Sequence, residues 1–482
     1  MRIRIGSGEL LCRRLDGVVA ARGIPYAAPP VGALRWRPPL PVPSWPEARF
    51  AYDPGPAPVQ PQPDRASVMW HTNFADRGAL VMSEDCLYLN VWTPDPFEGA
   101  RLPVMVFLHG GAHRFGHGGQ EIHDGAALAR RGVVVVTVNM RLGALGFLAH
   151  PELAEEDELG ASGNYGLLDV VAALEWVRRE ITAFGGDPAK VTLAGNSAGA
   201  AIVTHLMAAP AARGLFRAAI GQSSSGIFRA EGPMLDQREA QRAGLAAVGD
   251  ASLAGLRRLP ATSLLLDAHL GVVVDGRLIT RDTREVFVAG RQAPIPLLVG
   301  TTADEGAVYA HGAPAVPPAL ADCYPEGSAR LYVGETRFVY PVWRWARAHV
   351  ATAGAPTWMY RFDVAPPLPP GIDLLPPPDG LPGYGAYHTS ELPYTGDNLH
   401  VRDWPWRPSD RELARVMADA WARFVATGDP NGPGLPQWPR FDAGPDARVI
   451  VFGDPVRSAP MPRADALGLL DAVNSPGRAP RW

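Results

Sequence analysis

A short apolar run that stops at a serine between two glycines constrains the fold of this chain more than any other feature. Residues 191–199 read Val-Thr-Leu-Ala-Gly-Asn-Ser-Ala-Gly, which predicts a β-branched strand over 191–194 turning sharply into a helix that begins at Ala198. Gly195 and Gly199 are required because a Cβ at either position would collide with such a turn. The turn exposes the Ser197 hydroxyl at the carboxyl edge of a sheet, beside the free N–H groups of the helix.

A second predicted strand ends in glycines, whose backbone N–H groups can stabilise the oxyanion that a reactive serine generates. Residues 102–112 read Leu-Pro-Val-Met-Val-Phe-Leu-His-Gly-Gly-Ala. An attacked carbonyl becomes an oxyanion, which preorganised backbone N–H groups stabilise by about 3–4 kcal/mol per donor. Gly110, Gly111, Ala112 and Ala198 are therefore the candidate oxyanion-hole residues. Either motif alone is also typical of an ordinary turn, and the indication of acyl-transfer chemistry comes from finding both.

Short apolar runs alternate with helical patterns along the chain, which defines the fold class. The runs cover 103–108, 133–138, 191–194 and 295–299, and a helical pattern with apolar spacings of three and four covers 169–181. This alternation predicts a doubly wound, mostly parallel α/β sheet with helices on both faces. Ligands of such sheets bind at the carboxyl ends of the strands, where the Ser197 corner and the 109–112 loop are expected.

A serine hydroxyl needs a base and an acid, and this fold class places them after the serine in the order acid, then histidine. The strand over 295–300 runs into Asp304 and Glu305, and His388 lies in a glycine-containing loop. Both carboxylates fit the pattern. Other histidines also follow the serine, and the residues alone leave the base open between His388 and the competitors His205, His269, His311, His349 and His400.

Charge and cysteine content narrow the class of protein. With 45 basic and 49 acidic residues the formal net charge is −4, and no basic run interleaves with aromatic residues, so we expect no nucleic-acid partner. No apolar run reaches the length of about 18 residues that spans a membrane, and none at the amino terminus suits a secretory signal. Cys12, Cys86 and Cys323 are an odd number, which favours a reducing, cytoplasmic location.

Proline-dense segments and helical segments flank the expected sheet. Prolines crowd 54–63 and 366–382, which excludes regular helix or central strand there, while 405–427 has the pattern of an amphipathic helix. We expect one domain over 1–482, with cap elements over the site at about 54–82, 230–290 and 310–385.

Four histidines suggest a metal site only at first sight. His109, His113, His117 and His123 are spaced by four, four and six, which could align ligands on a helix. Glycines at 110, 111, 116, 118 and 119 oppose a helix there. We therefore expect loop histidines near the mouth of the site, with no metal and no cofactor.

Motifs along nearly the whole chain resemble those of type-B carboxylesterases of the α/β-hydrolase fold, the family of cholinesterases and bacterial para-nitrobenzyl esterases. The matching segments are 23–35, 83–90, 109–111, 139–147, 163–169, 184–199, 304–306, 388–391 and 427–431. The resemblance implies Ser197 as nucleophile, Glu305 as acid and His388 as base. It also implies oxyanion donors at Gly111, Ala112 and Ala198, and a buried structural ion pair between Arg35 and Glu84.

The chain departs from the family pattern at three informative positions. Asn196 stands where the family usually has glutamate before the serine, which argues against cationic choline-type esters. No cysteine lies some 25 residues before Cys86, so this thiol is expected to be free and buried. His113 replaces a frequent aromatic residue after the glycine loop and predicts a more polar pocket rim.

These observations predict a serine hydrolase that cleaves a small-molecule carboxylic ester in two steps and needs no cofactor. An amidase or carbamate hydrolase with the same triad is the alternative within enzymes. A non-catalytic, partner-binding member of the fold is the alternative outside them. Monomer and dimer both remain open.

Overall fold

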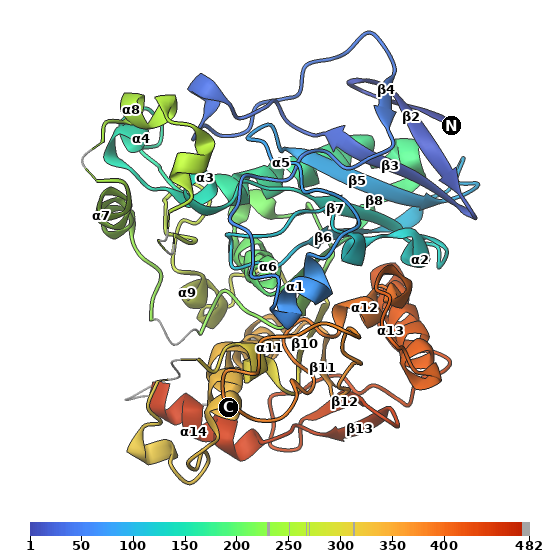
Figure 1. The fold of residues 1–482 in the computed structure, drawn as a ribbon, viewed down its shortest axis with the longest axis vertical. Helices are drawn as coiled ribbons and strands as arrows, with labels where there is room; N and C mark the ends of the chain where they lie inside the picture. The colour runs from blue at the N-terminus through green and yellow to red at the C-terminus, as the bar shows by residue number, and fades with distance from the viewer. Residues whose placement is uncertain (229–231, 250, 267, 269, 312–313, 475–482) are drawn as a thin grey trace.

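A single large twisted sheet organises the computed structural model, which describes residues 1–228, 232–249, 251–266, 268, 270–311 and 314–474 (Figure 1). Among these residues the sheet has 13 strands, in the order β1-β2-β3-β5-β7-β6-β8-β9-β10-β11-β12-β13, with β4 paired to β2. Strands β7, β6, β8, β9, β10, β11 and β12 pair in parallel, while the strands toward either end pair antiparallel, except that β4 pairs in parallel with β2. The mostly parallel α/β sheet expected from the sequence is confirmed.

The strands have the following bounds: β1 Arg2–Ile5, β2 Gly8–Leu15, β3 Val18–Pro25, β4 Arg49–Ala51, β5 Tyr88–Pro94, β6 Leu102–Leu108, β7 Val134–Val138, β8 Gly186–Asn196, β9 Ala218–Gln222, β10 Leu297–Thr302, β11 Thr357–Phe362, β12 Arg448–Phe452 and β13 Arg457–Pro460.

The helices have the following bounds: α1 Val68–Asn73, α2 Ala126–Ala129, α3 Gly143–Phe147, α4 Pro151–Glu155, α5 Tyr165–Glu180, α6 Ala198–Ala208, α7 Gln237–Val248, α8 Leu253–Arg258, α9 Thr283–Val288, α10 Ala329–Gly334, α11 Tyr340–Ala353, α12 Leu392–Thr395, α13 Pro408–Thr427 and α14 Ala464–Asn474. A π-helical turn over Glu335–Val339 joins α10 to α11.

Alternating side chains of the central strands enter two separate cores, one on each face of the sheet. In β6, Val104, Val106 and Leu108 join one core, and Met105 and Phe107 join the other. This follows from the two-residue period of a strand, and it explains why buried parallel strands are apolar without interruption. Side chains of α5, α6 and α11 complete the first core, while α2 and α13 complete the second.

The strand order reverses at β6, and this reversal positions the site. From β6 the chain passes to β7 on one side and then crosses to β8 on the other side of β6. The loops that leave the carboxyl ends of β6 and β8 therefore diverge and leave a crevice between them. Leu108 pairs with Gly195 at this edge, so the 109–112 loop and the Ser197 corner start side by side.

Candidate active site

The corner after β8 has the strained conformation that its glycines predict. Ser197 adopts φ 52° and ψ −122°, and α6 begins at the next residue. A Cβ on Gly195 would lie 2.5 Å from the carbonyl of Gly199, and one on Gly199 would lie 2.2 Å from the carbonyl oxygen of Leu108. Only glycine fits either position, because the turn brings the backbones of β6, β8 and α6 into contact.

Three side chains from distant parts of the chain form a hydrogen-bonded relay at this corner. The Ser197 Oγ lies 2.9 Å from Nε2 of His388, and Nδ1 of His388 lies 2.6 Å from Oε2 of Glu305. Glu305 is further fixed by the backbone N–H of Thr302, which donates to its other carboxylate oxygen at 2.8 Å. His388 and Glu305 are each only 1% exposed, so water does not compete for these bonds.

The neighbouring carboxylate and the other histidines have different contacts. Asp304 accepts a hydrogen bond from the N–H of Ala386 at 2.9 Å and is not bonded to His388. His205 bonds to Thr283, and His349 bonds to the carbonyl of Ile295. His311 and His400 are exposed, and His269 lies outside the described residues. Of the described candidates, the structure brings only His388 to the serine.

The glycine loop after β6 faces the serine. Gly110, Gly111 and Ala112 line the same cavity as Ser197 and His388. A Cβ on Gly110 would lie 3.1 Å from the Cβ of Ser197, so the bare backbone allows this close approach. Gly111 has φ 116° and Ala112 φ 53°, a left-handed stretch that turns successive peptide groups. Ala198 adds the first N–H of α6 directly after the serine.

The cavity that contains Ser197 is small and uncharged. Its volume is about 290 Å³, and α1 and the residues before it form part of its wall. The lining residues are Pro63, Ser67, Met69, Asn73, Phe74, Gly110, Gly111, Ala112, Phe115, Gln120, His123, Asn196, Ser197, Val308, Tyr309, His388, Thr389 and Leu392. No aspartate, glutamate, lysine or arginine is among them. Such a surface accepts a neutral, mainly apolar ligand.

Aromatic rings surround the imidazole of His388. The ring of Phe338 lies 4.4 Å from it and the ring of Tyr309 lies 5.3 Å from it, measured between centroids. Burial raises the pKa of Tyr309 to about 12, so its hydroxyl stays neutral near physiological pH. These contacts restrict the imidazole to the plane in which both of its hydrogen bonds form.

The sequence did not predict a buried carboxylate that contacts Asn196, the residue before Ser197. The side-chain amide of Asn196 donates to Oε1 of Glu391 at 3.3 Å, as does Nε2 of Gln222 at the same distance. Burial, and then the charge of nearby Glu305, raise the pKa of Glu391 to about 8. The matched motif 388–391 contains Glu391, but nothing in the sequence indicates that it contacts Asn196 and Gln222.

The histidines of the segment 109–123 are buried. Burial lowers the pKa of His109 to about 4 and of His117 to about 3, and it lowers the pKa of His123 well below its ordinary value. Within the described ranges, no group of three or more histidine, cysteine or acidic side chains could hold a metal ion.

The expected polar rim at His113 is wrong. This residue is 6% exposed, its ring lies 4.9 Å from that of Phe147, and it is not among the residues that line the cavity. Its backbone has a positive φ of 57°, and its ring packs against the last residue of α3.

Two expectations from the family pattern are confirmed away from the site. The guanidinium of Arg35 bonds both carboxylate oxygens of Glu84, at 2.7 and 2.6 Å, and donates to the carbonyls of Leu256 and Leu259. Cys86 is a free, buried thiol. Over the described part of the chain, none of the helices combines the length and apolar character needed to cross a membrane.

Comparison with known proteins identifies the family of the chain. The family model described as "Carboxylesterase family" matches residues 6–317 and 328–457. Fumonisin B1 esterase of Sphingopyxis macrogoltabida is 35% identical, over 90% of this chain and 83% of that protein. Para-nitrobenzyl esterase of Bacillus subtilis is 33% identical, over 91% of this chain and 94% of that protein.

Solved structures are also similar to nearly the whole chain. A thermophilic para-nitrobenzyl esterase superposes with a TM-score of 0.83 at 31% identity, covering 97% of this chain and 99% of the other. Carboxylesterase Est55 of Geobacillus stearothermophilus at pH 6.2 superposes with a TM-score of 0.81 at 32% identity, with the same coverage. The chain belongs to the carboxylesterase family and has its α/β-hydrolase fold.

Proposed function

We propose that the chain hydrolyses small, neutral carboxylic esters through an acyl-enzyme formed on Ser197. The single observation that carries this proposal is the relay in which Ser197, His388 and Glu305 are joined by hydrogen bonds of 2.9 and 2.6 Å. Family membership supports the reaction class, and the relay supports the roles of the three residues.

In the first step His388 acts as general base. Its Nε2 takes the proton of the Ser197 hydroxyl as Oγ attacks the carbonyl carbon of the ester. Glu305 keeps the Nδ1 proton in place and stabilises the imidazolium that forms. His388 then gives its proton to the departing alcohol oxygen, which leaves the acyl group bonded to Ser197.

In the second step the same groups act on water. His388 takes a proton from a water molecule, the hydroxide attacks the acyl carbon, and the proton returns to Oγ of Ser197 as the carboxylic acid leaves. Every proton transfer passes through Nε2 of His388, so no metal or organic cofactor is needed in this sequence.

Both tetrahedral intermediates carry an oxyanion that backbone N–H groups stabilise. We assign this role to Gly111, Ala112 and Ala198, with Gly110 beside them as a further candidate. The support is their position: three of them line the cavity of Ser197, and Ala198 begins α6. Each donor is expected to contribute about 3–4 kcal/mol to the transition state.

The cavity supports a neutral substrate of modest size. At about 290 Å³ it is at the lower limit of pockets that bind small molecules, and no aspartate, glutamate, lysine or arginine lines its walls. Residues 63–74 belong to the expected cap segment 54–82, and their place in the lining supports a role of this segment in substrate selection. The free cysteines support a cytoplasmic location.

Matched substrates test the proposal. We expect p-nitrophenyl esters with short acyl chains to turn over, with kcat/KM falling once the acyl group exceeds the cavity. A p-nitroanilide with the same acyl group is expected to react far more slowly, because its nitrogen leaving group needs a fuller proton transfer. Faster turnover of the anilide than of the ester would instead identify an amidase.

A further inference from the structure

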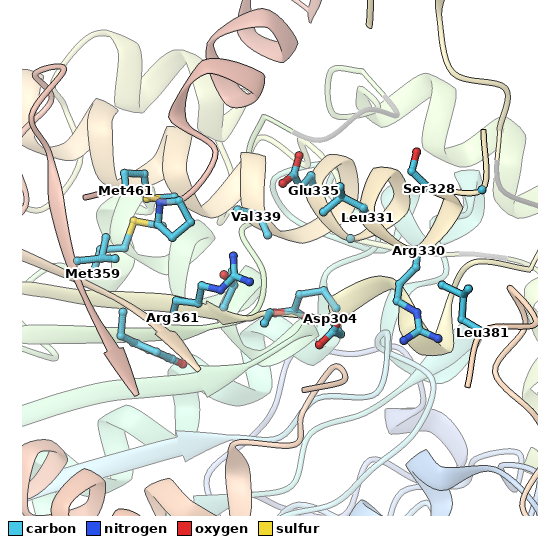
Figure 2. Close-up of a pocket in the computed structure, with 18 residues that line it drawn as sticks. Asp304, Ser328, Arg330, Leu331, Glu335, Val339, Met359, Arg361, Leu381 and Met461 are labelled. Atoms are coloured by element: carbon cyan, nitrogen blue, oxygen red, sulfur yellow. The ribbon is translucent and has the colours of Figure 1, made fainter. Parts of the chain in front are cut away.

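A second cavity, of about 150 Å³, lies beside the turn that carries Glu305 and shares no lining residue with the cavity of Ser197. Its walls come from the turn after β10, from α10 and the π-helical turn, from β11, and from the segment after β13. The labelled residues are Asp304, Ser328, Arg330, Leu331, Glu335, Val339, Met359, Arg361, Leu381 and Met461 (Figure 2).

Arg361 is the unusual residue of this cavity. It lies on β11, a strand paired on both sides, and shares the face of Met359, while Trp358, Tyr360 and Phe362 enter the opposite core. Its Nε is buried and has no hydrogen-bond partner. The one ion pair found for it among the described residues is with Asp363, at 3.7 Å, which is too long for a hydrogen bond.

The other charged side chains of the lining all have partners. Arg330 bonds both carboxylate oxygens of Asp379, at 2.6 and 2.9 Å. The remaining partners are Arg463 for Glu335, His388 for Glu305 and the N–H of Ala386 for Asp304. Arg361 is therefore the charged lining side chain that has no hydrogen-bonded partner among the described residues, and its partly exposed guanidinium can pair with an anion.

Part of the cavity wall is apolar. The π-helical turn Glu335–Val339 widens the helix above the sheet, and Leu331, Val339, Met359 and Met461 supply apolar wall. Figure 2 shows the Arg361 guanidinium below this helix, with Met359 and Met461 on one side and Asp304 on the other. A cavity of about 150 Å³ holds a molecule of the size of benzene. The Arg361 side chain is 30% exposed, so a ligand can reach it from solvent.

We propose that this cavity is a binding site for a small organic carboxylate, whose carboxylate pairs with Arg361 and whose apolar part of about six carbons fills the space under the π-helical turn. A guanidinium and a carboxylate form two parallel charge-assisted hydrogen bonds, which the terminal N–H groups of Arg361 would supply. That such acids are of the class released from Ser197 rests on the proposed function, whereas the binding itself does not.

Calorimetric titration with benzoate tests the site without any turnover. Arg361→Met is expected to weaken benzoate binding tenfold or more, because a charged hydrogen-bonding partner is lost. Arg361→Lys is expected to bind benzoate with an affinity between those of the wild type and Arg361→Met. Met461→Trp, which fills the apolar part, should weaken binding to a similar degree. Neutral benzamide is expected to bind the wild-type protein at least tenfold more weakly than benzoate.

A matched control separates this cavity from the catalytic one. Met69 lines only the cavity of Ser197, so Met69→Trp should leave benzoate binding within about twofold of wild type. Circular dichroism establishes that each variant is folded. The proposal is overturned if Met69→Trp abolishes binding while Arg361→Met does not, or if sodium chloride at equal concentration displaces benzoate. Since no ester is cleaved, these results stand whether or not Ser197 proves to be a nucleophile.

Discussion

Replacing Glu305 by glutamine tests the relay at its most sensitive point. The backbone N–H of Thr302 donates to Oε1 of Glu305, and Oε2 faces Nδ1 of His388. In Glu305→Gln the amide oxygen must stay opposite the Thr302 N–H, since the reverse orientation would bring two donors together in a buried site. The amide NH₂ then donates to Nδ1 of His388, which places the imidazole proton on Nε2.

A proton on Nε2 would disable the proposed base, because in the proposed mechanism this nitrogen accepts the proton of Ser197. The corresponding acid-to-amide change in a serine protease lowers kcat by about ten-thousandfold. For this chain we expect a loss of about a thousandfold to ten-thousandfold, or about 4–5.5 kcal/mol of transition-state stabilisation. KM should change little, since Glu305 does not line the substrate cavity.

The assay is steady-state hydrolysis of p-nitrophenyl acetate, with Asp304→Asn as the matched control. Asparagine at 304 can still accept from the N–H of Ala386 through its side-chain oxygen, so kcat should stay within about tenfold of wild type. Thermal unfolding of both variants shows whether each is folded. The reasoning is refuted if Glu305→Gln keeps more than a tenth of wild-type kcat, or if Asp304→Asn loses as much as Glu305→Gln.

Three further predictions concern the base, the pH dependence of stability and a buried ion pair. His388→Ala should lower kcat on p-nitrophenyl acetate by about a thousandfold or more, and a variant retaining over a tenth of it would exclude His388 as base. Burial raises the pKa of Glu391 from 4.5 to about 8. The contribution of Glu391 to the stability of the fold is therefore fully present below pH 4.5 and is lost as the pH rises to about 8. Glu391→Gln should accordingly gain Tm relative to wild type between those pH values, and parallel Tm curves would contradict this. Arg141 donates to both carboxylate oxygens of Asp169, and the two side chains are 4% and 0% exposed. Arg141→Met should therefore lower the free energy of unfolding in urea by about 3–5 kcal/mol. A loss under about 1 kcal/mol would show that the unpaired carboxylate is tolerated.

The parallel core of the fold could be predicted because its strands are nearly continuous apolar runs, which must be buried on both faces. The run over 133–138 is valine at every position except Thr137, which suits a strand covered on both faces, and residues 134–138 form β7. The expected helix over 169–181 is α5, which begins four residues earlier at Tyr165. Its N-cap, Asn164, has a left-handed conformation and makes no side-chain cap hydrogen bond, so the usual start signal was missing.

The antiparallel strands before residue 100 were not predicted individually. Strand β2 is partly exposed and contains two arginines, and β3, which forms a hairpin with β2, pairs on its other side with the distant strand β5. Pairing of that kind depends on tertiary contacts that a local pattern does not encode.

For the site, the order of the motifs along the chain narrowed the candidates for the acid and the base, and packing in the folded protein distinguishes adjacent candidates. Asp304 and Glu305 fit the sequence pattern equally well, and only the backbone direction at the end of β10 distinguishes them: the N–H of Thr302 holds Glu305 against His388. The network around Glu391 and the cavity of Arg361 form where elements far apart in sequence meet, so no window of the sequence indicates them.

The most direct test of the central claim is covalent labelling with a fluorophosphonate probe, followed by peptide mass spectrometry. An activated serine attacks phosphorus as it attacks a carbonyl, so one adduct is expected on the peptide that contains Ser197. Ser197→Ala should take up no label and show no ester turnover while unfolding at the same temperature as wild type. An adduct on a different residue, or a folded Ser197→Ala variant that still hydrolyses p-nitrophenyl acetate, would contradict the account.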